Sequence, residues 1–116
     1  MDEEKNGVIV ENGIKEVVAV YDDRKEFVID DKGYFLIRLD RKNENIEVAF
    51  CKERNKIFLK VVGKKPIDIY QTILNKEKLD IRKDHAAYLG RELQKAYTAL
   101  KFNIDYVQDD ELVLKK

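Results

Sequence analysis

The sequence predicts an α+β fold, in which a mainly antiparallel meander sheet carries two helices packed on one face. Three observations support this two-layer prediction. Apolar residues recur at every second position through three consecutive segments, as half-buried antiparallel strands require. The connections between these segments are short and polar, which indicates strands that follow one another along the chain. After Gly63 the apolar spacing changes to three and four residues, which is typical of helices that pack on a sheet.

The three central strands are predicted over residues 34–39, 46–51 and 57–62. A turn at residues 30–33 precedes the first strand, and Gly33 is the structural residue that completes this turn. In each strand alternate residues share one face, and these residues are Phe35, Ile37, Leu39, Ile46, Val48, Phe50, Ile57, Leu59 and Val61.

The N-terminal part of the chain is predicted to contain a hairpin. Residues 1–6 are polar and are expected to form a disordered tail, followed by a single domain over residues 7–116. Asn12-Gly13 lies between apolar segments at residues 8–10 and 14–21, and both of its residues tolerate a positive φ. We therefore expect these two segments to pair.

Two helices are predicted in the second half of the chain. Pro66 suits the first turn of a helix, where its missing N–H costs nothing. The second helix is expected to start at Asp84, whose carboxylate would act as the N-cap. Its apolar stripe consists of Ala86, Leu89, Leu93, Ala96 and Leu100. Short strands are expected at residues 104–107 and 112–114, on either side of a turn.

The second helix also holds the candidate functional residues. At 100° per residue, His85, Tyr88 and Glu92 line one edge of the apolar stripe. A neutral imidazole beside a carboxylate and a phenol could transfer a proton, and Arg91 could bind an anionic group. The alternative is that His85 and Tyr88 are border residues with local hydrogen bonds and that Arg91 is a surface charge.

Gly90 stands in the middle of the same helix, where it costs about 1 kcal/mol relative to alanine. Such a glycine allows a strand or a second helix to approach closely, or leaves space for a ligand. We favour close packing, either within the chain or across a dimer interface.

Composition argues against several classes of function. The 23 basic and 23 acidic residues cancel, so no overall field recruits nucleic acid or an anionic membrane. One histidine and one cysteine cannot build a structural zinc site, and no glycine-rich phosphate loop is present. Cys51 is expected on the outer face of its strand as an unactivated thiol. The longest apolar run, Val17–Tyr21, is too short to span a bilayer.

The same composition predicts where the protein works. A single cysteine and a polar, acidic start favour a cytoplasmic location. The abundance of lysine and glutamate resembles the composition of heat-adapted proteins.

Residues 27–37, 84–93 and 106–109 resemble a small domain family of unknown function from archaea, especially methanogens, and from cyanobacteria. Members of that family stand alone or are fused to proteins resembling one of the subunits of tetrahydromethanopterin S-methyltransferase. The resemblance implies a link to pterin-dependent one-carbon metabolism and supplies no catalytic residues. The residues of the second helix that match the family pattern are Asp84, His85, Tyr88, Gly90, Arg91 and Glu92.

Two functional hypotheses therefore remain open. In the first, the chain is an accessory interaction domain rather than an enzyme, forms a homo-oligomer and contacts a methyltransferase-like protein. In the second, it binds a small anionic ligand such as a pterin derivative. Arg91 would then hold the ligand, and His85, Tyr88 and Glu92 would supply polar contacts or proton transfer.

Overall fold

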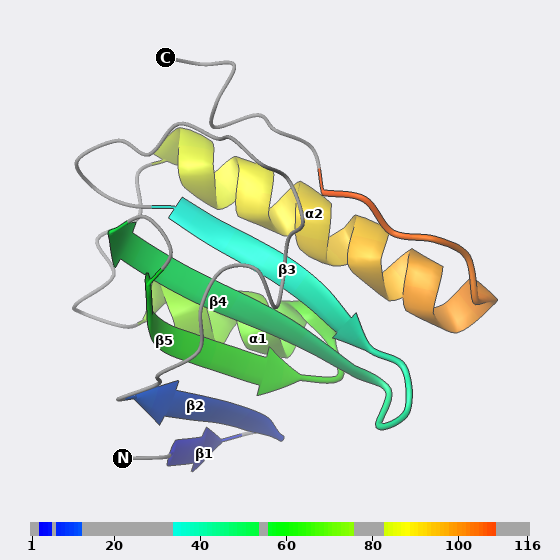
Figure 1. The fold of residues 1–116 in the computed structure, drawn as a ribbon, viewed down its shortest axis with the longest axis horizontal. Helices are drawn as coiled ribbons and strands as arrows, with labels where there is room; N and C mark the ends of the chain where they lie inside the picture. The colour runs from blue at the N-terminus through cyan, green and yellow to red at the C-terminus, as the bar shows by residue number, and fades with distance from the viewer. Residues whose placement is uncertain (1–2, 6, 13–33, 54–55, 76–82, 109–116) are drawn as a thin grey trace.

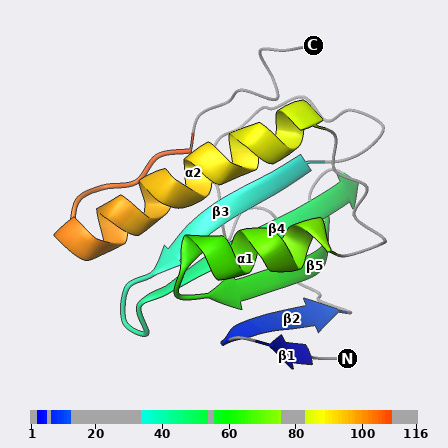
Figure 2. The ribbon, with the colours of Figure 1, turned by 180° about the vertical axis from the view of Figure 1, so that it is seen from behind.

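The computed structural model describes residues 3–5, 7–12, 34–53, 56–75 and 83–108 of the 116-residue chain. Within these ranges an antiparallel sheet has the strand order β1-β2-β5-β4-β3. Figures 1 and 2 show that helices α1 and α2 both lie on one face of this sheet. The predicted α+β fold is thus confirmed. The elements are β1 (Glu3–Lys5), β2 (Val8–Asn12), β3 (Tyr34–Asp40), β4 (Asn45–Glu53), β5 (Lys56–Gly63), α1 (Pro66–Leu74) and α2 (Lys83–Phe102).

Strands β3, β4 and β5 form the predicted meander. β3 pairs with β4 without interruption from Tyr34 to Asp40, whereas the pairing of β4 with β5 is irregular around Cys51. In the turn between β3 and β4, the Asn43 side chain donates a hydrogen bond of 2.9 Å to Asp40 Oδ2. This hydrogen bond holds the pKa of the Asp40 carboxyl below its ordinary value.

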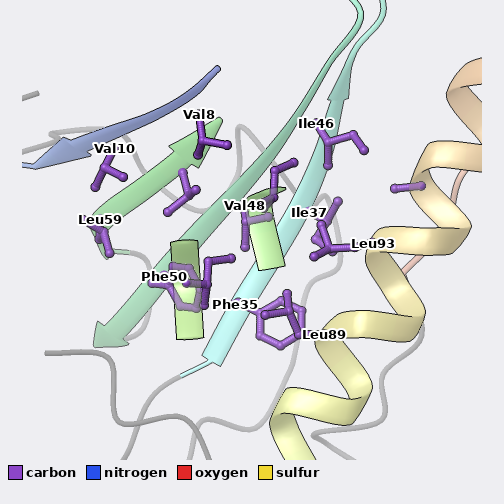
Figure 3. Close-up of a cluster of buried hydrophobic side chains, with 14 of the residues drawn as sticks. Val8, Val10, Phe35, Ile37, Ile46, Val48, Phe50, Leu59, Leu89 and Leu93 are labelled. Carbon is purple, nitrogen blue, oxygen red and sulfur yellow. The ribbon is translucent and has the colours of Figure 1, made fainter. Parts of the chain in front are cut away.

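The core lies between the sheet and the two helices, as the alternation of apolar residues predicts. Figure 3 shows apolar side chains of β2, β3, β4 and β5 gathered opposite Leu89 and Leu93 of α2. Ile69 of α1 is fully buried in the same cluster. The strand residues of the cluster are Val8, Val10, Phe35, Ile37, Ile46, Val48, Phe50, Leu59 and Val61.

The face of the sheet opposite the helices is more buried than half-buried strands predict. Leu36 and Ala49 alternate with the core residues of their strands, yet both are buried. Two charged side chains on this face, Glu47 and Lys60, are buried as well, and Glu47 also binds Arg38. Lys60 Nζ lies 3.9 Å from Glu47 Oε1, so the buried charges are paired, as their desolvation requires.

The N-terminal residues depart from the prediction. Glu3–Lys5 form β1 and pair with β2, so this part of the expected disordered tail is an edge strand. Lys5 pairs with Val8, and Gly7 between them has a φ of +78°, a left-handed conformation that glycine adopts without strain. A run of three charged residues does not predict a strand. The backbone hydrogen bonds of a hairpin, however, do not depend on the side chains.

The hairpin predicted at Asn12-Gly13 is wrong for the first part of its first strand. Ile9 and Val10 pair with β1 on one side and with β5 on the other, so neither edge is left for residues 14–21 at these positions. Those later residues, like Gly33 and its turn, lie outside the described residues.

The end of β5 passes very close to α1. A Cβ atom on Gly63 would lie 2.8 Å from Cγ1 of Ile69 and 3.1 Å from Cγ2 of Val8. Both neighbours are buried, so they have little room to move. Gly63 is therefore required by the close approach of β5 and α1.

Candidate functional site

Helix α2 positions the candidate residues, and its start differs by one residue from the prediction. It begins at Lys83, so Asp84 lies in the first turn and does not precede the helix as an N-cap. The helical spacing of apolar residues cannot locate a boundary to a single residue.

The other end of α2 is closed by a defined motif. Asn103 has a φ of 52°, and the N–H of Ile104 donates to the carbonyl of Ala99 over 3.0 Å, as in a Schellman motif. The guanidinium of Arg41, from the turn after β3, donates to the carbonyls of Ala99 and Ile104. These contacts turn the chain back along the helix.

Residues 103–108 follow this turn, and we call them the C-terminal strap. Figures 1 and 2 show the strap running back along α2 after the helix ends. The strap is not a strand, so the strand predicted at residues 104–107 is wrong. Four of its residues are exposed, whereas Tyr106 and Gln108 are half-buried.

Gln108 closes the outer edge of β3 with its side chain. Its Oε1 accepts a hydrogen bond from the backbone N–H of Ile37 over 2.8 Å, and its Nε2 donates to the carbonyl of Phe35 over 3.0 Å. Among the strands that the structure describes, β3 lies at an edge of the sheet, and these two backbone groups are ones that a further strand would use. Because the N–H of Ile37 needs an acceptor, the orientation of the carboxamide is defined. The Gln108 side chain thus makes two hydrogen bonds of the kind that a further strand would make with β3.

Tyr88 of α2 contacts both Phe35 and Gln108. It is only 2% exposed, and its ring centroid lies 4.9 Å from that of Phe35. Gln108 Nε2 also donates to the Tyr88 hydroxyl over 2.9 Å. The polar tip of a buried tyrosine is thereby satisfied within the chain.

Glu92, one turn further along α2, binds the middle of the strap. It is 1% exposed, and its Oε1 accepts a hydrogen bond of 2.8 Å from the hydroxyl of Tyr106. Lys95 Nζ lies 3.2 Å from its other carboxylate oxygen and 5.7 Å from the centroid of the Tyr106 ring. A buried carboxylate is costly unless it is paired and hydrogen-bonded, and here it is both.

The structure therefore unites two of the four candidate residues, Tyr88 and Glu92, at the strap. His85 is half-buried near the start of α2, and Arg91 is exposed. Because Arg91 faces solvent whereas its neighbour Glu92 is buried, the two side chains do not line the same surface.

Sequence reasoning missed Gln108, which had been placed in a turn, and it gave no role to Tyr106. Both belong to residues 106–109, which carry part of the family resemblance. That resemblance is the sequence signal that could have identified them. Among the residues that the structure describes, no group of three or more His, Cys, Asp or Glu side chains could hold a metal ion. Neither described helix combines the length and apolar character needed to cross a bilayer.

Gly90 lies where α1 crosses α2. A Cβ atom at this position would lie 3.4 Å from Cε1 of Tyr70, a residue of α1. Gly90 therefore lies next to a second helix of the same chain, as expected. An added Cβ would be at an ordinary van der Waals distance from the Tyr70 ring.

The part of the chain that matches known proteins includes α2 and the strap. Residues 29–109 match the sequence family described as PterinBD-DUF4346. The chain belongs to this family. No solved structure matches the chain.

Two relatives of this family member are themselves described as uncharacterized. The chain is 38% identical over 100 residues to the uncharacterized protein MJ0107 of Methanocaldococcus jannaschii, which covers 84% of this chain and 18% of that protein. It is 36% identical over 88 residues to the uncharacterized protein ycf91 of Porphyra purpurea, covering 70% of this chain and 71% of that protein. The chain thus spans less than a fifth of the first relative and most of the second.

Proposed function

We propose that this PterinBD-DUF4346 domain is a non-catalytic accessory domain that self-associates and serves proteins of pterin-dependent one-carbon metabolism. The observation that supports the proposal is that the side chains of Tyr88 and Glu92 hydrogen-bond to the strap. Both are buried, and both bind the strap, so the polar groups of the candidate proton relay already serve the fold. A general acid or base must reach the substrate atom on which it acts, whereas the polar groups of Tyr88 and Glu92 are bound to the strap.

The accessory role is supported by the size of the archaeal relative. The matching region is 18% of that protein, so a similar domain occurs within a much longer chain. The family description contains the abbreviation PterinBD, which favours partners that handle pterins. The partner that we propose is a methyltransferase-like protein, as the family resemblance of the sequence implies.

Self-association is supported by exposed apolar residues at the end of α2 and on the strap. Phe102, Ile104 and Val107 are 74%, 53% and 74% exposed, and we call these three residues the apolar strip. Large exposed apolar side chains that lie close along the chain are candidates for an interface. Burying the strip against a second copy would remove this apolar area from water.

Sedimentation equilibrium over a wide range of protein concentration tests this proposal. We expect concentration-dependent dimers of the wild type and their loss in a Phe102→Ser, Val107→Ser double variant. The matched control is Asp105→Ser, which changes an exposed strap residue between the two and should leave the dimer intact. A wild type that stays monomeric at every concentration would contradict the proposal.

A second candidate function is the binding of a pterin-like anion, and the family description favours it. His85, Tyr88, Arg91 and Glu92 would supply the contacts, with exposed Arg91 as the anion-binding group. A thermal-shift screen against pterins and folates, with His85→Ala and Arg91→Ala as variants, tests this function. A ligand at about 100 times its Kd would stabilise the wild type by about 2.7 kcal/mol. The first proposal predicts no shift with any of these compounds.

A further inference from the structure

We draw no further inference here: the strongest candidate, the row of charged side chains that crosses the face of the sheet opposite the helices (Glu11, Lys60, Glu47 and Arg38), carries none, because these charges pair with one another within the chain and nothing among the described residues shows a ligand or partner that they would bind.

Discussion

The two helices are attached to the same sheet in different ways. α1 is short and is held by shape, because Ile69 is fully buried and packs against Gly63, where no further atom fits. α2 has its own buried apolar stripe, but its Tyr88 and Glu92 are satisfied by a segment outside both sheet and helix. Tyr106 of this segment also packs against the core cluster, so apolar contact and hydrogen bonds together hold the segment to α2. The difference between the two helices therefore lies in the buried polar groups of α2, which need partners from outside the helix.

The largest effect is expected on the α1 side, from Ile69→Ala. This change leaves a cavity in the tightest part of the core, and it should lower the free energy of unfolding by about 2–5 kcal/mol. Urea denaturation followed by circular dichroism measures the loss. The matched control is Ile67→Ala on the same helix, where the side chain is 57% exposed and little stability should be lost. Equal losses in the two variants would contradict the shape-held description.

Gly63→Ala tests the same contact from the other side. The added methyl group would meet Ile69 at 2.8 Å, so the helix or the strand must shift. We expect a loss of about 1–3 kcal/mol in urea denaturation, as overpacked cores show. A variant as stable as the wild type would mean that α1 can move away from β5.

Gln108→Ala tests the hydrogen-bonded side and should have a smaller effect. Loss of the carboxamide leaves the N–H of Ile37 and the carbonyl of Phe35 to water, at a cost of about 1 kcal/mol. The sharper measurement is amide hydrogen exchange, which should accelerate at Ile37. Val107→Ala changes an exposed neighbour and should leave that exchange rate unchanged. Protection at Ile37 that survives the loss of Gln108 would show that something else covers the β3 edge.

The smallest effect, and one of opposite sign, is expected from Gly90→Ala. The new methyl group would lie 3.4 Å from the Tyr70 ring, an ordinary contact, while a helix gains up to about 1 kcal/mol from the change. A modest rise in melting temperature should result. A clear fall would show that the crossing of α1 and α2 is as tight as the contact at Gly63.

The parts of the fold that were predictable are those governed by periodicity. Alternation in β3, β4 and β5 and the three-four spacing of α2 follow from which side chains must leave water. β1 was not predictable in this way, because its residues are all charged and its pairing rests on backbone bonds. Lys5 and Val8 flank an Asn-Gly pair, a hairpin signal as strong as the one chosen further along the chain.

The candidate site was predicted in part, for a related reason. Helical spacing places Tyr88 and Glu92 on one edge of a helix, and the structure has both buried there. Spacing within a helix says nothing of what lies opposite that edge. Gln108 reaches the backbone of β3 from 71 residues away, and only the tertiary structure reveals such a contact.

That separation along the chain also bears on how the domain is made. Contacts between neighbouring strands of the meander are local and can form as soon as residues 34–63 are available. The β3 edge cannot receive its carboxamide until residue 108 has been synthesised and the loop between them has closed. During synthesis the backbone groups of Phe35 and Ile37 therefore lack the Gln108 side chain, and they can mispair with other nascent chains until residue 108 reaches them.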